Sequence, residues 1–597
     1  MLSTKHLPPV SWVTVTALVG SLVFIFAIIT DAEWISAGSI VFAITLLVPP
    51  LVTRPSPLVE TSLGRDSLAT RLATASTKSA VAMWVALGAI VTWVTLTDAA
   101  ATTAGVLFGL LVAVAIIVAS ATRRLTTVSM LAVSTREQAY PRVMALALSL
   151  VRVTCALGFV ALGFWGQTQI VALTLATICT VLLATAGALT VYALARREQW
   201  TQENFDALAA LEPVFAVHVS GPSGSAYQVA MWLPYLERAD APFVLIVREA
   251  ALFQEISALT TAPAVFARTL ADLDRLTTLG FGTAFYVNNG VKNGHLVRRS
   301  EVHHVQLLHG ESDKVSSRNP VTLAFDSVFV AGQAAIDRYW NHGIHIPRER
   351  FVIVGRPQVE AIEPARELTP GSQRTVLYAP TWNGFFGDAE YSSLPLGVEL
   401  VESLLRAGAK VIFRPHPYSH KSRRLSEIIG EIDAMLAADS ATTGTDHVFG
   451  ARATTTASTN DVINASDVMI SDVSSVPIDY LYSEKPQAIV EMIPDSLDRT
   501  PGCATLATGA YVVDASADFD ALVRNLLHDD PLASARSAAR DYYLSDHTRE
   551  DYAELFVAAV RDVLAGHAHA TITDRGAAGD GDATRSEEIE AEVTLFD

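Results

Sequence analysis

The sequence predicts an α-helical membrane domain followed by two doubly wound α/β domains. Half of the 597 residues are hydrophobic although the formal net charge is −18. A soluble surface with that charge needs more polar residues, so the apolar ones must be concentrated in one part of the chain. After Arg197 the pattern becomes short strand, loop and helix, repeated, which is typical of parallel sheets with crossover helices.

The first domain, residues 1–197, is expected to be a multi-span transmembrane domain. Apolar stretches of spanning length recur there between short loops that carry the charges. The first stretch is not followed by a small-residue cleavage site and a polar mature start, which disfavours a signal peptide. We expect about six spans: Val10–Thr30, Trp34–Val52, Ala80–Thr97, Ala101–Ala121, Val143–Phe164 and Ile170–Ala195.

The loop charges predict the orientation of these spans. Cytoplasmic loops carry an excess of Lys and Arg, and here these residues gather after the second, fourth and last spans. The intervening turns carry acidic residues or no charge. Both termini and the α/β domains are therefore expected in the cytoplasm. The basic residues are Arg54, Arg65, Arg71, Lys78, Arg123, Arg124, Arg136, Arg142, Arg196 and Arg197.

Two α/β domains are expected at residues 205–360 and 374–566, separated by the polar, proline-containing stretch Glu360–Gln373. The cleft between two such domains is the natural ligand site. Residues 567–597 are rich in Gly, Asp and Glu and are expected to form a disordered acidic tail. The expected strands are Val214–Val219, Phe243–Val247, Thr283–Val287, His304–Leu308, Ser327–Val330, Phe351–Val354, Thr375–Tyr378, Val411–Arg414, Val468–Ser471, Gln487–Val490 and Tyr511–Val513.

Composition excludes several classes of site and partner. Cys155, Cys179 and Cys503 are too few and too scattered for a disulfide framework or a zinc site. No His-x-x-x-His pair, Ser-His-Asp order or cysteine nucleophile stands out, so no metal is expected. The acidic balance, with no basic stripe in the soluble half, argues against nucleic acid as a partner.

The sharpest motif is Arg414-Pro415-His416-Pro417, directly after an apolar strand. The prolines stiffen the loop and delay the next helix, which holds His416 at the carboxyl end of a parallel strand. Its imidazole could accept a proton from an attacking hydroxyl or donate a hydrogen bond to a phosphate. A loop histidine with a backbone partner is the alternative.

A second polar loop, His309-Gly310-Glu311-Ser312-Asp313-Lys314, follows the strand that ends at Leu308. Gly310 permits close backbone approach or a positive φ. A histidine beside carboxylates and an ammonium is typical of a general base with an orienting carboxylate. An ordinary polar loop fits the same residues equally well.

The third motif, Ser471-Asp472-Val473-Ser474-Ser475, ends one strand and opens a helix at Val476. Hydroxyls, unpaired backbone N–H groups and the positive end of the helix dipole together suit a pyrophosphate. Ser and Asp also serve as ordinary N-caps, and both roles can hold at once.

Two weaker signals flank these motifs. The turn Gly221–Ser225, with Ser223 and Ser225, lacks the lysine of a Walker loop and the full dinucleotide fingerprint. Thr381 and Trp382 follow the strand that ends at Tyr378, and Trp382 could stack on a base or pack at a domain interface.

Taken in order, the His309-Gly310 loop, Leu377–Trp382, Arg414–Pro417 and Ser471–Ser475 resemble the CDP-glycerol glycerophosphotransferase family of teichoic acid synthesis. The resemblance covers Val214–Ala565. It implies a GT-B-like pair of Rossmann-type domains, the first receiving the acceptor and the second holding the nucleotide donor. Many members carry Thr-Pro after His-Gly, and they usually meet the membrane through an amphipathic surface. This chain has a charged loop and its own spans instead.

The resemblance also implies roles for the motif residues. His309 would act as the catalytic base, and His416, the second catalytic residue, would contact the donor phosphates. The implied donor-binding residues are Arg414, Ser471, Asp472, Ser474, Ser475, Thr381 and Trp382, and the acceptor-side residues are Gly310, Glu311, Asp313, Lys314, Ser223 and Ser225.

The hypothesis that follows is attack by an acceptor hydroxyl on the β-phosphate of a CDP-alditol, with CMP leaving and no cofactor, at the bacterial plasma membrane. The acceptor would be a polyprenyl-linked polymer or a glycolipid in the lipid bilayer. One alternative is a nucleotide-sugar glycosyltransferase on the same fold. Another is a membrane transporter or sensor with a nucleotide-binding soluble half, although Arg152 is the single charge inside the spans, which disfavours transport.

Overall fold

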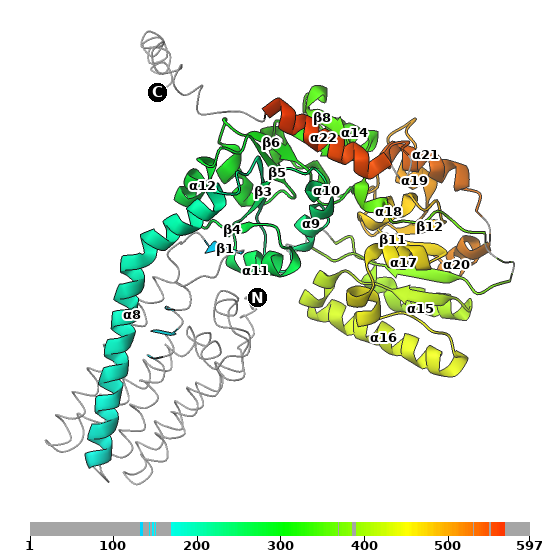
Figure 1. The fold of residues 1–597 in the computed structure, drawn as a ribbon. Coiled ribbons are helices and arrows are strands. Elements are labelled where there is room, and N and C mark those ends of the chain that lie inside the picture. Colours follow the sequence, from blue (N-terminus) through cyan, green and yellow to red (C-terminus); the bar gives the residue numbers. More distant parts are fainter. Residues whose placement is uncertain are drawn as a thin grey trace, which may run out of the picture. The chain divides into compact units, whose positions relative to one another are not determined.

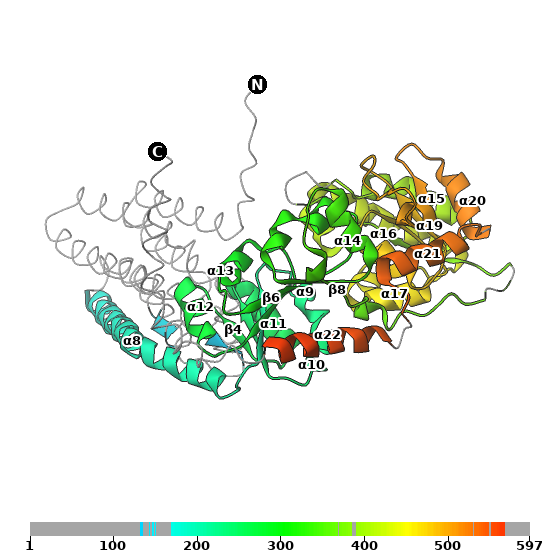
Figure 2. The ribbon, with the colours of Figure 1, turned by 90° about the horizontal axis from the view of Figure 1, so that it is seen from above.

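The computed structural model describes residues 169–567, apart from gaps at 368, 370, 385–389, 529 and 548–550, together with a few residues between 132 and 150. Figures 1 and 2 show these parts as a coloured ribbon. The chain divides into two compact units, which are described separately. The first comprises Met1–Pro213, Ser220–Ala226 and Phe243–Leu279, and the second comprises Val214–Val219, Tyr227–Pro242 and Gly280–Asp597.

One helix of the first unit is long and apolar enough to cross a membrane. It is α8 (Gln169–Ala209), and an 18-residue window within its stretch Thr177–Ala209 has a mean hydropathy of 2.0. This helix contains the last predicted span, Ile170–Ala195. The other five predicted spans, Val10–Thr30, Trp34–Val52, Ala80–Thr97, Ala101–Ala121 and Val143–Phe164, lie outside the described residues apart from isolated positions in the fifth, and so does the predicted tail beyond His567.

Apart from α8, the described residues of the first unit include a small α/β layer. Strand β4 (Ala264–Phe266) pairs in parallel with β3 (Phe243–Val247) and antiparallel with the two-residue β1 (Ala132–Val133). Helix α11 (Ala250–Leu259) precedes β4, and α12 (Leu270–Thr277) follows it. Helix α12 begins with a capping box, in which Thr269 and Asp272 satisfy each other's backbone N–H groups.

The second unit contains a parallel sheet with the strand order β2-β5-β6-β7-β8. The stretch Ala226–Glu237 contains two helices, α9 (Tyr227–Ala230) and α10 (Leu233–Glu237), because Pro234 lies in the first turn of α10 and cannot donate to the turn before it. The strands and the remaining α-helices are β2 (Phe215–Val219), β5 (Thr283–Tyr286), β6 (His303–Gln306), β7 (Ser327–Val330), β8 (Phe351–Ile353), α13 (Gly294–Val297) and α14 (Gln333–Asn341).

The same unit contains a second parallel sheet, with the order β10-β9-β11-β12-β13. Successive residues of β9 face two different apolar cores: Val376 and Tyr378 face one, and Leu377 and Ala379 face the other. The sheet is therefore covered by helices on both faces, as its continuous apolar strands predict. Its strands are β9 (Thr375–Ala379), β10 (Lys410–Phe413), β11 (Val468–Asp472), β12 (Gln487–Val490) and β13 (Tyr511–Val513).

Helices alternate with these strands, and the last helix returns to the first sheet. Phe556 of the last helix stacks on Trp232, with ring centroids 5.0 Å apart, and this helix lies beside α10 in Figure 1. The helices are α15 (Gly397–Arg406), α16 (Arg423–Thr443), α17 (Thr459–Ala465), α18 (Val476–Leu481), α19 (Leu506–Gly509), α20 (Phe519–His528), α21 (Ala533–Leu544) and α22 (Asp551–His567). The predicted parallel α/β sheets are thus confirmed.

Candidate functional site

His309 lies in the loop after β6, and its surroundings define which ring nitrogen carries the proton. Nδ1 lies 3.1 Å from the carbonyl oxygen of Val287. Because a carbonyl can only accept, Nδ1 holds the proton and Nε2 presents a lone pair. Burial lowers the pKa of His309 to about 4, the Val287 bond opposes this shift, and the Arg356 guanidinium adds to it. His309 is therefore a neutral proton acceptor at pH 7.

His416 lies in the loop after β10 and has the opposite arrangement. The backbone N–H of Tyr418 donates to Nδ1 at 3.1 Å, so Nε2 carries the proton. The ring stacks on Trp382, with centroids 6.0 Å apart, and meets Tyr418 edge to face. Burial, together with the charges of Lys314 and His309, lowers the pKa of His416 to about 4. At pH 7 this side chain is a neutral hydrogen-bond donor.

Lys314 reaches from the His309 loop to the loop after β9. Its Nζ donates to Thr381 Oγ1 at 2.9 Å and lies 5.1 Å from the ring centre of Tyr391. Burial lowers the pKa of Lys314, while the carboxylate of Asp472 raises it. The ammonium thus lies within electrostatic range of both His416 and Asp472.

Asp472, at the end of β11, is fully buried and holds the surrounding loops rather than facing solvent. Its oxygens accept from the backbone N–H of Thr381 at 2.9 and 3.0 Å and from the N–H and hydroxyl of Ser393 at 2.9 and 3.1 Å. Burial raises the pKa of Asp472 to about 6, and these bonds oppose that rise. The carboxylate therefore positions Thr381 and supplies a negative counter-charge to Lys314.

The serines at the end of β11 and directly after it differ in their contacts. Ser471 is fully buried and donates to the carbonyl of Ala379 at 2.7 Å, which ties β11 to β9. The buried hydroxyl oxygen of Ser474 has no hydrogen-bond partner among the described residues. Ser475 precedes α18 and approaches Gly310: a Cβ at Gly310 would lie 3.0 Å from Ser475 Cβ. Gly310 is thus required for close approach, the first of the two reasons that the sequence predicted.

The two carboxylates of the His309 loop are engaged inside the protein. Glu311 accepts from Arg338 Nη1 at 3.0 Å, and Asp313 lies 3.6 Å from Arg338 Nε. Asp313 also accepts from the hydroxyl of Tyr543 at 2.9 Å. Arg338 is only 2% exposed, so this network fixes the loop, and the acceptor-side role that the resemblance implies for Glu311 and Asp313 stays a prediction.

Arg414 and the turn at Ser223 are also occupied by internal contacts. Arg414 donates to the backbone carbonyls of Ala453 and Ala457, so it braces the segment before α17. In the first unit, the hydroxyl of Ser223 and the N–H of Gly224 both donate to Glu255, and Ser225 is buried. The hydroxyl and N–H groups of this turn that could donate to a phosphate therefore already donate to the carboxylate of Glu255.

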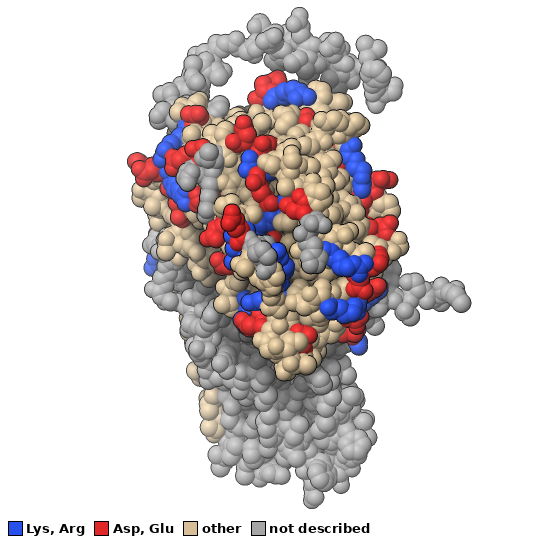
Figure 3. All heavy atoms as spheres, turned by 90° about the vertical axis from the view of Figure 1, so that its right-hand side faces the viewer, with Lys and Arg blue, Asp and Glu red and all other residues tan. Residues whose placement is uncertain are grey.

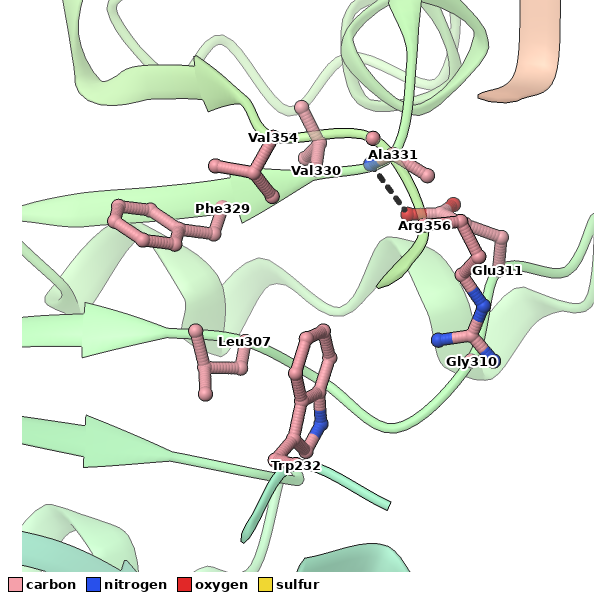
Figure 4. A pocket seen from close by; sticks show the side chains of 10 residues that line it. Trp232, Leu307, Gly310, Glu311, Phe329, Val330, Ala331, Val354 and Arg356 are labelled. Atoms are coloured by element: carbon pink, nitrogen blue, oxygen red, sulfur yellow. Dashed lines mark hydrogen bonds between the residues drawn. The ribbon is translucent and has the colours of Figure 1, made fainter. Parts of the chain in front are cut away.

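Arg356, which the sequence reasoning missed, lies beside the His309 loop. It is 3% exposed and donates two hydrogen bonds to Asp479 of α18, at 2.9 and 3.2 Å. It also lines a small pocket at the carboxyl ends of β6, β7 and β8, where Trp232 and Phe329 form an apolar wall and Glu311 a polar edge (Figure 4). The signal was present: Arg356-Pro357 follows a strand as Arg414-Pro415 does.

Charge on the surface is mixed. On the face shown in Figure 3, acidic and basic side chains are interspersed, so that face does not gather basic residues into a stripe. Among the residues that the structure describes, no group of three or more His, Cys, Asp or Glu side chains could hold a metal ion.

Comparison with a family model gives a match over the site. Residues 275–502 match the model of CDP-Glycerol:Poly(glycerophosphate) glycerophosphotransferase. The matched segment contains the loops of His309, Thr381, His416 and Ser474. No curated protein sequence matches the chain.

Solved structures with similarity to this chain include the following three. The wall teichoic acid polymerase TagF is 12% identical and has a TM-score of 0.39, and the match covers 63% of this chain and 96% of that one. A UDP-GlcNAc 2-epimerase from Neisseria meningitidis, bound to UDP-GlcNAc, is 9% identical, with a TM-score of 0.38 and coverage of 58% and 100%. Another UDP-N-acetylglucosamine 2-epimerase is 13% identical, with a TM-score of 0.40 and coverage of 59% and 95%.

Proposed function

We propose that this CDP-glycerol glycerophosphotransferase-like transferase moves glycerol phosphate, or a similar alditol phosphate, from a CDP-activated donor to a hydroxyl of a lipid-linked cell-envelope polymer or glycolipid. The observation that carries the proposal is the opposite polarity of two histidines within the matched segment. His309 presents a lone pair at Nε2, and His416 presents an N–H. One accepts a proton and the other donates a hydrogen bond, as transfer to a hydroxyl requires.

The reaction balances without a cofactor. The acceptor oxygen attacks the β-phosphorus, and a new P–O bond forms while the bond to the bridging pyrophosphate oxygen breaks. CMP leaves with that electron pair, and the hydroxyl proton passes to His309 Nε2. His416, through Nε2–H, donates to a phosphate oxygen on which negative charge accumulates, and Lys314 adds a nearby positive charge.

Two features support a donor site beside His416. The hydroxyl of Ser474 is buried without a hydrogen-bond partner in the part of the chain that the structure describes, and it can donate to a phosphate oxygen. The stacked pair of Trp382 and His416 gives a flat aromatic surface, and Thr381, beside Trp382, is hydrogen-bonded to Asp472 in the loop of Ser474. In this proposal Asp472, Ser471 and Arg414 act indirectly. They hold the loops whose side chains donate hydrogen bonds to the substrate.

We also propose that the chain is a multi-pass protein of the bacterial plasma membrane, with its α/β domains in the cytoplasm. Helix α8 supports the association with the membrane, because its stretch Thr177–Ala209 has membrane-spanning length and composition. The further spans and the orientation are proposed from the sequence pattern. Membranes from expressing cells should retain the full chain through an alkaline carbonate wash. Release of the chain into the wash would contradict the proposal.

The experiment that tests the reaction uses the full chain in detergent, incubated with CDP-glycerol, CDP-ribitol and UDP-sugars, with membrane lipid extract as the acceptor source. Release of CMP from one CDP-alditol, reduced about 10²–10⁴-fold in His309→Gln and in His416→Gln, is the expected result. His345→Gln, at an exposed histidine, is the matched control. Release of UDP alone would instead identify a glycosyltransferase.

A further inference from the structure

A continuous chain of hydrogen bonds leads from the loop after β5 to the ring of His309. The backbone N–H of Gly290 donates to Asn288 Oδ1 at 2.9 Å, and Asn288 Nδ2 donates to Gln228 Oε1 at 2.7 Å. Gln228 Nε2 then lies 3.4 Å from His309 Nε2, and His309 Nδ1 lies 3.1 Å from the carbonyl of Val287. Four links therefore connect two backbone groups through three side chains.

The backbone groups at the two ends determine the direction of every link. An amide N–H can only donate, so Asn288 must turn its oxygen towards Gly290 and its NH₂ towards Gln228. Gln228 must then turn its NH₂ towards His309. At the other end a carbonyl can only accept, which places the proton on Nδ1 and the lone pair on Nε2 of the histidine. Both ends independently assign Gln228 as the donor and His309 Nε2 as the acceptor.

The loops that carry this chain are held by further contacts. The carbonyl of Asn288 accepts from the side chains of Asn293, at 2.6 Å, and Gln306, at 3.1 Å. Gln306 in turn accepts from the N–H of Leu308, and the indole of Trp232 donates to the carbonyl of Leu308 at 2.8 Å. These contacts fix the geometry of the chain of hydrogen bonds from Gly290 to Val287, which is called the relay from here on. The relay is therefore part of the sheet edge and is not a chance contact of mobile side chains.

We propose that Gln228 is a positioning residue for the base of the proposed reaction: it fixes the Nδ1–H form of His309 and occupies its Nε2 lone pair until the acceptor hydroxyl replaces it. This inference rests on the proposed function. At 3.4 Å the contact between the two nitrogens is at the long end of hydrogen-bond geometry. An incoming hydroxyl, which donates at a shorter distance, therefore exchanges with it at low cost.

Other titratable groups face His309 from several elements. They are Arg356 after β8, His416 after β10 and Tyr227 of α9, whose ring centre lies 6.1 Å from that of the histidine. Arg356 and His416 are unchanged in substitutions at Gln228, so a change in the titration of His309 in such variants reports on the relay itself.

The variant that reverses the last link is Gln228→Glu. A carboxylate accepts where the amide donates, so it favours a proton on His309 Nε2 and raises the pKa of the base. Activity then falls at pH 6 and recovers at higher pH, and the acidic limb of kcat/KM moves upward by about one pH unit or more. Asn288→Asp is expected to shift the limb in the same direction, because it forces the Gln228 amide to turn its oxygen towards the ring.

Gln373→Glu, at an exposed glutamine before β9, is the matched control and should leave the limb in place. Superimposable profiles for Gln228→Glu and the unmodified protein would overturn the proposal. Selective ¹⁵N-histidine labelling of the full chain, with His309→Gln for assignment, gives a readout that needs no activity. The expected spectrum shows a protonated Nδ1 and an unprotonated Nε2, and the opposite tautomer would also overturn the proposal. Absence of CMP release with the expected tautomer present would refute the reaction and leave the relay standing.

Discussion

Gly310 brings the loop of the proposed base against the start of α18. A Cβ at this position would lie 3.0 Å from Ser475 Cβ and 3.2 Å from its hydroxyl oxygen. Gly310→Ala must therefore push the two loops apart by a few tenths of an ångström. Because transfer depends on the placement of reacting groups, kcat/KM should fall by about 10–100-fold, with little change in melting temperature.

Gly294→Ala is the control for this substitution, since nothing lies within 4 Å of the added methyl group. Steady-state kinetics and thermal melting of the two variants would be compared side by side. Equal activities would show that the close approach of Gly310 to Ser475 has no bearing on the reaction.

Sequence could predict the residues that follow strands, but not their partners. Polar residues after apolar strands marked His309 and His416, because ligands bind at the carboxyl ends of parallel strands. The engagement of Glu311 and Asp313 by Arg338 could not be foreseen, since the arginine comes from a helix about 25 residues later and looks like any surface residue of α14. Gln228 was hidden for the same reason: its meaning depends on a partner 81 residues away.

Among the secondary-structure elements, β8 and α22 meet at a glycine. Gly355 follows β8 with a φ of +67°, and a Cβ there would lie 2.2 Å from Tyr552 Cδ1 of α22. Gly355→Ala combines a left-handed backbone with a collision, and should lower the free energy of unfolding by about 2–5 kcal/mol. Gly343→Ala has a similar φ of +75° and open space around it, so it should cost only about 1–2 kcal/mol.

Denaturant unfolding of both variants would measure this difference. If the two glycine variants lost the same stability, the packing of Tyr552 against Gly355 would not contribute.

The strands were predicted well because each is a continuous apolar run between turn residues, whereas β4, with three residues, is too short to carry such a pattern. The division of α9 from α10 needed attention to Pro234, which a helical periodicity alone does not register.

For the whole molecule, the buried histidines predict how stability depends on pH. The pKa values of His309 and His416 are each lowered to about 4 in the folded protein. Between the unfolded value, about 6.5, and pH 4 the unfolded chain binds two protons that the folded protein does not, so stability falls as the pH falls through this window. Asp472, with its pKa raised to about 6, binds a proton in the folded protein first and partly opposes this loss.

The melting temperature should therefore drop from pH 7 to pH 5, and the drop should be smaller in the double variant His309→Gln, His416→Gln. All other groups titrate alike in both proteins, so the comparison isolates the two histidines. Identical pH slopes for the variant and the unmodified chain would contradict the assignment of depressed pKa values.

Helix α8 continues without interruption across residues 197–205, where the sequence suggested a boundary between domains. Arg275 of α12 holds one side of its polar end, through Glu198 at 3.1 Å and the ring of Phe205. In a continuous helix, each inserted residue rotates the part of the helix beyond it by about 100° and moves that part by about 1.5 Å along the axis. In the proposed membrane arrangement, the contacts with Arg275, roughly twenty residues away, therefore set which side of the apolar end of α8 faces lipid. A single residue inserted between the two would turn a different side towards it.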